Sequence, residues 1–171
     1  MASSTDAAPG VPMRAFVGLG ANLGEPGRAL RQALVALAGL PRTRVRACSR
    51  HYRSAPIEAS GPDFINAVAM LETGLSPRAL LASLHEIEAA AGRERGQRNA
   101  PRTLDLDLLL YAARELHDTD IQLPHPRLAE RAFVLRPLFE LAPELTLPDG
   151  RMIAGCAARI TGQRLTPLDH A

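Results

Sequence analysis

The spacing of apolar residues along the first half of the chain alternates between the periods of strands and helices. A β-branched and aromatic run from Arg14 (RAFVGLG) predicts a strand that leads into glycines. Residues 26–40 carry leucines at helical spacing, which predicts one amphipathic helix. The alternating segment 43–54 is typical of an edge strand, and the more apolar segment 64–73 predicts a buried strand. This half of the chain therefore predicts a strand, a helix and two further strands.

The second half repeats the helix-to-strand pattern once and then changes character. Ser76 can cap a helix that Gly92 ends, with leucine and isoleucine side chains on its inward face. A strand expected at 101–111 completes the order strand, helix, strand, strand, helix, strand, which is the split βαβ pattern of the α+β, ferredoxin-like class. In that class the helices pack on one face of an antiparallel sheet. Residues 137–141 and 152–160 predict two short helical pieces as C-terminal additions.

Two aspartates interrupt the last of these strands, in the stretch PRTLDLDLLLY. In a helix, residues two apart point about 200° away from each other, whereas a strand puts Asp105 and Asp107 on one face. That face is expected to hold alternate residues of the strand: Thr103, Asp105, Asp107, Leu109 and Tyr111. The opposite face is expected to hold the leucines that enter the core: Leu104, Leu106, Leu108 and Leu110. Paired carboxylates of this kind suit one or two Mg²⁺ ions. Solvated aspartates, or aspartates paired with nearby arginines, explain the pattern equally well.

An arginine-rich loop precedes the two aspartates, since RERGQRNAPR (93–102) contains four arginines in ten residues. Charged loops are often only solvated. Guanidinium groups also bind phosphate oxygens bidentately, and Arg102 is three residues from Asp105. Carboxylates for a metal beside arginines for phosphate favour chemistry on a magnesium nucleotide.

Composition adds limits on domain number and on the class of chemistry. The chain has 171 residues, 46% of them hydrophobic, and no apolar run long enough to cross a bilayer, so we expect residues 14–171 to form a single domain. Residues 1–13 lack the features of a secretion signal, and we expect them to be a disordered lead-in to a cytoplasmic protein. All 20 basic residues are arginine, which excludes the lysine of a Walker A loop and a Schiff-base lysine. Cys48 and Cys156 are too few for a disulfide framework.

Five regions, in matching order, resemble the 6-hydroxymethyl-7,8-dihydropterin pyrophosphokinase family of folate biosynthesis. They run from about Arg14 to about Gly150: FVGLGANLG, YRSAPI with GPDFINAVAMLET, GRER, PRTLDLDLLLY and PHPRLAERAFVLRPLFELAPEL. The resemblance implies a ferredoxin-like fold. It also implies transfer of the β,γ-diphosphate of ATP to the hydroxymethyl oxygen of the pterin, with release of AMP. Two Mg²⁺ ions as cofactors and ATP as co-substrate follow from the same resemblance.

The resemblance also implies roles for residues around ATP. Asp105 and Asp107 match the ligands of the two Mg²⁺ ions, and together with Arg93 and Arg102 they form the expected catalytic set. The residues that match contacts to ATP are Glu88, Arg93, Arg95, Arg102, His125 and Arg131. The positions that depart from the best-known family pattern, near the lid and the adenine, are His85, Asn99 and Pro126.

A further set of residues matches the pterin-binding positions of the family: Ser54, Ile57, Phe64, Asn66 and Phe133. The amide of Asn66 matches an asparagine that pairs with the donor and acceptor edge of the ring. Phe64 and Phe133 match two aromatics that sandwich it, where stacking adds roughly 0.5–1.5 kcal/mol beyond burial. From the residues alone, ordinary core packing is the simpler account of both phenylalanines.

Two other functions fit parts of the sequence. A two-metal nucleotidyl transferase also carries paired acidic residues on strands, but it releases pyrophosphate in place of AMP. A ferredoxin-like RNA-binding module needs exposed strand aromatics, and four phenylalanines and two tyrosines without such a signature disfavour it. The glycines of GLGANLG lack dinucleotide-binding spacing, so we expect them to serve a tight turn near the cleft. We therefore expect small-molecule substrates, no nucleic-acid or membrane partner, and a monomer.

Overall fold

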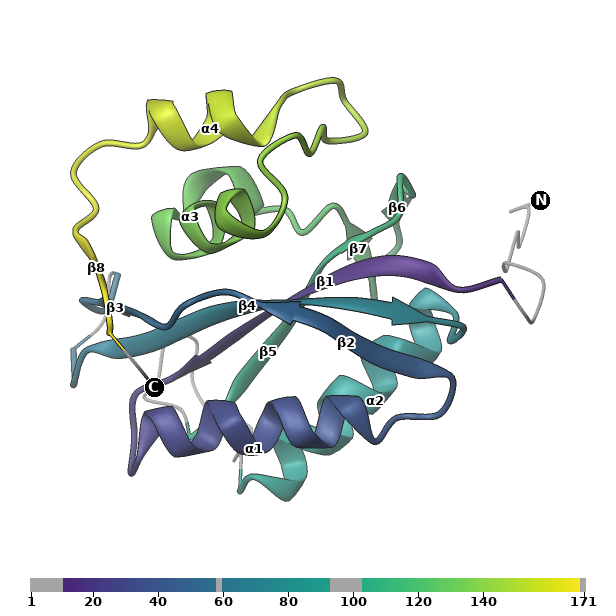
Figure 1. Cartoon of the computed structure of the whole chain (residues 1–171), viewed down its shortest axis with the longest axis horizontal. Coiled ribbons are helices and arrows are strands. Elements are labelled where there is room, and N and C mark those ends of the chain that lie inside the picture. Colours follow the sequence, from purple (N-terminus) through teal and green to yellow (C-terminus); the bar gives the residue numbers. More distant parts are fainter. Residues whose placement is uncertain (1–10, 58–59, 93–102, 170–171) are drawn as a thin grey trace.

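The structure is a computed structural model that describes three parts of the chain: residues 11–57, 60–92 and 103–169. Its elements form three layers, with the largest sheet in the middle (Figure 1). Two helices, α1 (Pro26–Ala38) and α2 (Pro77–Ala90), cover one face of this sheet. Two others, α3 (Ala132–Leu141) and α4 (Ile153–Arg159), lie over the opposite face. The ferredoxin-like α+β class is confirmed, and the C-terminal additions build an extra layer on it.

Within the described residues, the central sheet has six strands, and all its neighbouring strands pair antiparallel. Its strands are β1 (Met13–Ala21), β2 (Thr43–Cys48), β3 (Tyr52–Ser54), β4 (Phe64–Thr73), β5 (Asp105–Tyr111) and β8 (Leu165–Pro167). They follow the order β5–β1–β4–β3–β8, and β2 also pairs with β4. Three segments that are distant in sequence therefore lie side by side in the sheet, with β1 between the edge strand β5 and β4.

Local sequence signals explain where α2 begins and ends. Ser76 caps α2 as predicted, because its Oγ accepts a hydrogen bond from the backbone N of Ala79 at 3.2 Å, and Pro77 occupies the first turn. Gly92 follows this helix with a positive φ of 80°.

The shorter elements after β5 are β6 (Leu116–His117), β7 (Gln122–Leu123) and the 3₁₀ helix η1 (Leu128–Glu130). Among the described residues, we find no helix with the length and apolar character needed to cross a membrane.

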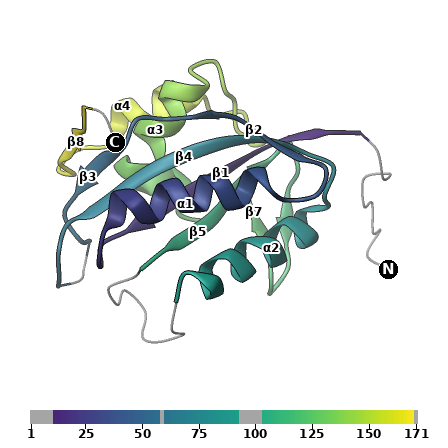
Figure 2. The same cartoon turned by 60° about the horizontal axis from the view of Figure 1, so that its bottom comes forward.

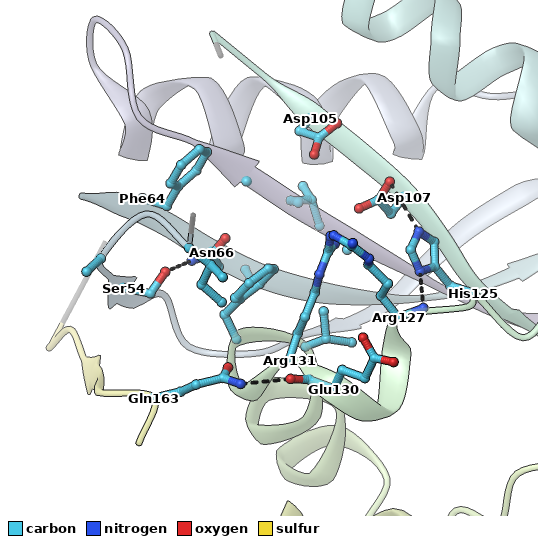
Figure 3. A pocket seen from close by; sticks show the side chains of 18 residues that line it. Ser54, Phe64, Asn66, Asp105, Asp107, His125, Arg127, Glu130, Arg131 and Gln163 are labelled. Carbon is cyan, nitrogen blue, oxygen red and sulfur yellow. Dashed lines mark hydrogen bonds and ion pairs between the residues drawn. The ribbon is translucent and has the colours of Figure 1, made fainter. Parts of the chain in front are cut away.

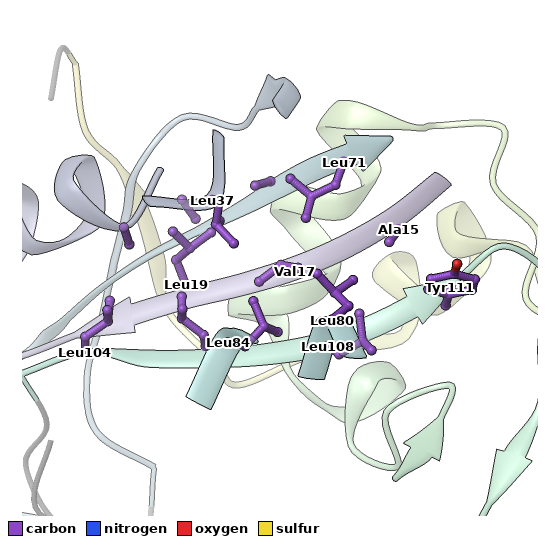
Figure 4. Close-up of a cluster of buried hydrophobic side chains, with 14 of the residues drawn as sticks. Ala15, Val17, Leu19, Leu37, Leu71, Leu80, Leu84, Leu104, Leu108 and Tyr111 are labelled. Atoms are coloured by element: carbon purple, nitrogen blue, oxygen red, sulfur yellow. The ribbon is translucent and has the colours of Figure 1, made fainter. Parts of the chain in front are cut away.

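Each face of the sheet carries its own hydrophobic core. The first core lies between the sheet and helices α1 and α2, and Figure 4 shows part of it around Val17, Leu37 and Leu80. The second core joins the sheet to α3 and α4 and includes Phe16 and Leu135. Alternate residues of one strand therefore enter different cores, as expected for a sheet that is covered on both faces (Figure 2).

An irregularity in the pairing of β5 with β1 changes the predicted alternation near the end of the strand. Adjacent residues of β1 pair with Leu108 and Leu110, so Leu109 is an extra residue on β5. Leu110 consequently joins Leu109 in the second core, and Tyr111 enters the first. The predicted faces of Leu110 and Tyr111 are therefore wrong, because a bulge resets which face each later side chain takes.

Three further boundaries differ from the prediction. The strand predicted over 43–54 is broken between β2 and β3, where the Oγ of Ser49 accepts a hydrogen bond from the backbone N of Val68 at 3.0 Å. The first C-terminal helix, α3, extends well upstream of the predicted piece and contains Pro137 in its interior. Proline is favoured in a first turn and was therefore a misleading marker of the helix start. No sequence pattern predicted the edge strand β8.

Candidate active site

The second face of the sheet is not fully covered, and a cavity of about 330 Å³ lies between it and the segment that leads into α3 (Figure 3). Strands β1, β3, β4 and β5 form its floor. The opposite wall comes from the segment after β7, the start of α3 and Gln163. A cavity of this size falls within the range of pockets that bind small molecules, which is about 300–1,000 Å³.

Asp105 and Asp107 lie on β5 with their side chains in this cavity, as the alternation predicts. Both are half-buried, and each pairs with a glycine of β1: Asp105 with Gly20 and Asp107 with Gly18. Because glycine has no side chain, β1 places no side chain of its own beside either carboxylate. Two carboxylates on one partly buried face repel each other, and this arrangement favours a cation beside them.

The glycines of β1 form part of the cavity floor instead of the predicted tight turn. Gly18 and Gly20 are strand residues, and Gly24, in the segment that follows, has a positive φ of 64°. A Cβ on Gly20 would lie only 3.0 Å from the Oδ1 atom of Asn66. A Cβ on Gly18 would meet the side chain of Leu109 at an ordinary 3.5 Å. The missing side chain at Gly20 therefore makes room for Asn66.

His125 faces the carboxylates from the segment after β7. Its Nε2 lies 3.9 Å from Oδ1 of Asp107, and its Nδ1 accepts a hydrogen bond from the backbone N of Arg127 at 3.1 Å. An accepting Nδ1 leaves the proton of the neutral ring on Nε2, the atom nearest Asp107. Burial lowers the pKa of His125, the charge of Arg131 lowers it further, and Asp105 partly opposes them. His125 is thus held as a neutral hydrogen-bond donor at neutral pH.

Two guanidinium groups, from Arg127 and Arg131, converge in the cavity on the side of Asp107 (Figure 3). In the part of the chain that the structure describes, neither forms an ion pair with a carboxylate. The guanidinium carbon of Arg131 lies 5.4 Å from the centroid of the Phe133 ring, which supports this side chain against an aromatic face. Two converging cations without a carboxylate partner favour an anionic ligand such as phosphate.

The other end of the cavity combines an amide with two aromatic rings. Asn66 and Ser54 are buried, and Nδ2 of Asn66 donates a hydrogen bond to Oγ of Ser54 at 2.8 Å. This bond fixes the amide plane and leaves Oδ1 and a second N–H to pair with a flat heterocycle. Phe64 on β4 and Phe133 on α3 line the same cavity from different elements, and Ile57 lies at its rim. The arrangement suits a planar ring that carries both donors and acceptors.

The cavity brings together most of the residues that the sequence singled out: Ser54, Ile57, Phe64, Asn66, Asp105, Asp107, His125, Arg131 and Phe133. Glu88 is not among them. It is 2% exposed on α2, and its Oε1 accepts a hydrogen bond from the backbone N of Leu106 at 2.6 Å. This bond anchors α2 to β5, and the contact of Glu88 with a nucleotide stays a prediction.

Other predicted positions lie away from the cavity or outside the described residues. His85 and Pro126 are exposed and are not part of the cavity lining. The positions that lie outside the described residues are Arg93, Arg95, Asn99 and Arg102.

Sequence reasoning missed several residues that line the cavity, notably Arg127, Glu130 and Gln163. Arg127 lies two positions after His125 in the segment PHPRLAER, so its place next to a predicted phosphate contact could have marked it. Gln163 carried no such signal. It reaches the site across 31 positions of sequence, and no local pattern surrounds it.

Comparison with known proteins gives a family match over most of the chain. A family model described as 7,8-dihydro-6-hydroxymethylpterin-pyrophosphokinase (HPPK) matches residues 16–143. The 2-amino-4-hydroxy-6-hydroxymethyldihydropteridine pyrophosphokinase of Pseudomonas aeruginosa is 47% identical over 148 residues, which cover 84% of this chain and 91% of the relative. The protein of the same name from Haemophilus influenzae is 38% identical over 156 residues, which cover 91% of this chain and 98% of the relative.

Solved structures of larger proteins share the fold. A Plasmodium falciparum HPPK-DHPS triple mutant with SDX-DHP matches with a TM-score of 0.71 at 12% identity and covers 86% of this chain. An HPPK-DHPS in complex with substrates matches with a TM-score of 0.68 at 11% identity and covers 87% of this chain. The chain spans only 41% and 43% of the length of these two proteins, and at such low identity the likeness shows the fold alone.

Proposed function

Because the chain belongs to the 7,8-dihydro-6-hydroxymethylpterin-pyrophosphokinase family, we propose that it transfers the diphosphate of ATP to the hydroxymethyl oxygen of 6-hydroxymethyl-7,8-dihydropterin. The products are the pterin diphosphate and AMP, and the reaction belongs to folate biosynthesis. The family resemblance seen in the sequence is confirmed by this match. The observation that carries the function is one cavity that combines an acidic pair, two cations and an amide beside aromatic rings.

The amide end of the cavity would bind the pterin. Asn66 is pre-oriented by Ser54, so it would pair with the donor and acceptor edge of the ring without first losing rotamer freedom. Phe64 and Phe133 would stack on its two faces, each contact adding roughly 0.5–1.5 kcal/mol beyond burial. Ile57 would cover the ring at the rim. A ring held in this way directs its hydroxymethyl group toward the charged end.

Asp105 and Asp107 would hold Mg²⁺, which the resemblance implies as two ions. Among the described residues, no group of three or more His, Cys, Asp or Glu side chains is arranged to hold a metal. The acidic pair nevertheless fits Mg²⁺, which commonly uses one or two protein carboxylates and completes its shell with phosphate oxygens and water. When bound, Mg²⁺ supplies positive charge that offsets the charge of the triphosphate beside the two carboxylates.

The protein contributes mainly positioning to this reaction, because phosphoryl-type transfer needs little covalent catalysis. The hydroxymethyl oxygen attacks the β-phosphorus in line, the bond from β-phosphorus to the bridging oxygen of the α-phosphate breaks, and the hydroxyl proton is lost to solvent. Arg127 and Arg131 would bind oxygens of the transferred diphosphate, and His125 would donate a hydrogen bond from Nε2. These fixed donors stabilise charge as it develops, without reorganisation. The ATP contacts of Glu88, Arg93, Arg95 and Arg102 stay predictions.

Product analysis tests the proposal directly. The chain is incubated with ATP, Mg²⁺ and 6-hydroxymethyl-7,8-dihydropterin, and phosphorus NMR follows the nucleotides. We expect AMP and pterin diphosphate in equal amounts, and no AMP when the pterin is omitted. Pyrophosphate as the product would favour a nucleotidyl transferase, and ADP would indicate transfer of a single phosphoryl group. Either result would overturn the proposed reaction.

The alternative of an RNA-binding module has less support. The aromatic residues of β1, β3 and β5 are Phe16, Tyr52 and Tyr111, and all three are buried, so these strands offer no exposed ring for base stacking. The monomeric state and the cytoplasmic location stay predictions.

A further inference from the structure

The start of α3 is held by a side chain that is distant in sequence. Arg131 is the N-cap residue of this helix, and its own side chain makes no capping hydrogen bond. Instead, Oε1 of Gln163 accepts a hydrogen bond from the backbone N of Ala132 at 2.9 Å. Nε2 of Gln163 donates to the backbone O of Glu130 at 2.8 Å (Figure 3). A single amide thus binds peptide groups on both sides of Arg131.

We propose that Gln163 is a positioning residue for diphosphate transfer, because its amide fixes the direction in which Arg131 and Phe133 enter the cavity. The inference rests on the proposed function, in which Arg131 binds phosphate and Phe133 stacks on the pterin. Gln163 lies outside residues 16–143, the part of the chain that the family model matches. A segment beyond the matched region therefore completes the wall of the site.

The two hydrogen bonds act where α3 cannot hold its own backbone. The carbonyl oxygen of Arg131 already accepts a helical hydrogen bond from the backbone N of Leu135 at 3.0 Å. The backbone N of Ala132 is among the groups that a helix start leaves without an intrahelical partner, and Gln163 binds it. Restraining both peptides around Arg131 limits rotation of its backbone. A misplacement of about 1 Å in a positioning group can slow a well-oriented reaction about 100-fold.

Gln163 is itself fixed, because it lies just before the edge strand β8. In this strand Leu165 pairs with Ser54 of β3, and the backbone N of Leu168 donates to the backbone O of His51 at 2.8 Å. Ser54 in turn holds the amide of Asn66. We call the two hydrogen bonds of Gln163, to Glu130 and Ala132, the Gln163 clamp. Through β8 and β3, this clamp links the side of the cavity that carries Asn66 to the side that carries Arg131 and Phe133.

Substitution of Gln163 tests the proposal. Gln163→Leu removes both hydrogen bonds at similar volume, and because the residue is exposed the variant should still fold, with the modest loss of stability expected when a helix start loses its cap. We expect kcat/KM to fall about 10- to 100-fold, with the loss divided between kcat, through Arg131, and the KM for the pterin, through Phe133. Gln163→Glu keeps the oxygen that accepts from Ala132 but loses the N–H that donates to Glu130. Its kcat/KM should lie between those of the wild type and Gln163→Leu. Arg164→Leu, at the exposed neighbouring position, is the matched control and should keep wild-type kinetics.

A double-mutant cycle separates positioning from a general structural role. If Gln163 acts through Arg131, the losses of Gln163→Leu and Arg131→Ala should combine less than additively in kcat/KM. Additive losses, or wild-type kinetics in Gln163→Leu, would overturn the inference. Should Gln163→Leu fail to fold, the same cycle is run with Gln163→Glu.

A separate outcome concerns the proposed function. If the wild-type chain releases no AMP, the proposed function fails. The role of Gln163 is then tested by fluorescence titration of the pterin. Unchanged pterin affinity in Gln163→Leu would overturn the positioning role of Gln163.

Discussion

The two faces of the central sheet are made by the same strands, yet one face is a closed core and the other contains the cavity. Toward α1 and α2, β1 contributes Val17 and β5 contributes Leu106, and both are buried. One position further along each strand, the other face carries Gly18 and Asp107, which line the cavity. A step of a single residue along each strand therefore separates a residue of the hydrophobic core from one that lines the cavity.

This difference implies that stability and activity can be changed separately, even within one strand. Val17 and Leu106 are buried in the hydrophobic core of the closed face, so lost side-chain volume there costs folding free energy. The open face is partly solvated, with 32% of the Asp107 side chain exposed, so polar substitutions there cost little folding free energy. We therefore expect neighbouring substitutions on β5 to have opposite effects.

Asp105→Asn and Asp107→Asn should have the largest effect on activity. Each variant should lose turnover by about 1,000-fold or more, because a neutral amide is a poor ligand for Mg²⁺ and the triphosphate charge is left unbalanced. The free energy of unfolding should change little, because the substitution is nearly isosteric and both side chains are only partly buried. AMP release and urea unfolding measure the two quantities, with the exposed Asp120→Asn as control. Full activity of either variant at saturating Mg²⁺ would contradict the metal assignment.

Leu106→Ala, between the two aspartates, should give the reverse result. Leu106 is 3% exposed in the first core, so its truncation should cost about 2–5 kcal/mol of unfolding free energy. The fraction that remains folded should keep kcat within a few-fold of wild type, because no cavity-lining atom changes. Urea titration and kinetics at low temperature test this. A variant that is fully folded by circular dichroism but inactive would show that the two faces are not separable.

Gly20→Ala should have an intermediate effect, confined to pterin binding. Its Cβ would lie 3.0 Å from Oδ1 of Asn66, so the buried amide must shift from its position. We expect pterin affinity to fall about 10-fold, in line with an overpacking cost of about 1–3 kcal/mol. Gly18→Ala is the matched control, because its Cβ would make an ordinary 3.5 Å contact. Fluorescence titration measures both, and equal losses would show that Asn66 is not the cause.

The smallest expected effect is a pH dependence at the edge of the closed face. His51 is buried, and its Nδ1 has no hydrogen-bond partner among the residues that the structure describes. Burial lowers the pKa of His51 from the ordinary 6.5, and the charge of Arg31 lowers it further. As the pH falls, His51 binds a proton in the unfolded chain before it does so in the folded chain. The free energy of unfolding is therefore highest above the ordinary histidine pKa and declines as the pH falls below that pKa. Urea unfolding at about pH 7.5 and 5.5 should show this decline.

Substitution of His51 separates its contribution to the pH dependence of stability from that of other titrating groups. His51→Gln should flatten the decline, whereas the exposed His117→Gln should not. A decline of equal slope in both variants would assign the effect to other groups.

The parts of the fold that the sequence predicted are those that local chemistry determines. The alternation around Asp105 and Asp107 places both carboxylates in one cavity, and Ser76 caps its helix, because each signal depends only on nearby residues. The family resemblance added Asn66 and Phe133, which come together only in the folded chain.

Other features depend on contacts that no local pattern contains. The bulge at Leu109 depends on how β5 pairs with β1, and a strand's own sequence does not state its register. Gln163 and β8 depend on partners far along the chain. The position of Glu88 shows a different limit, since a buried carboxylate can be held by a backbone amide instead of a ligand.

The edge strand β8 also sets an order in time. Among the residues that the structure describes, it is the last strand of the sheet in sequence, and it pairs with β3 alone, at the border of the sheet. Since chains are synthesised from the N-terminus and begin to fold as they emerge, the central strands can associate before this segment exists. A nascent chain would thus have most of its sheet while one wall of its cavity is still missing, and synthesis of Gln163 and β8 would add that wall.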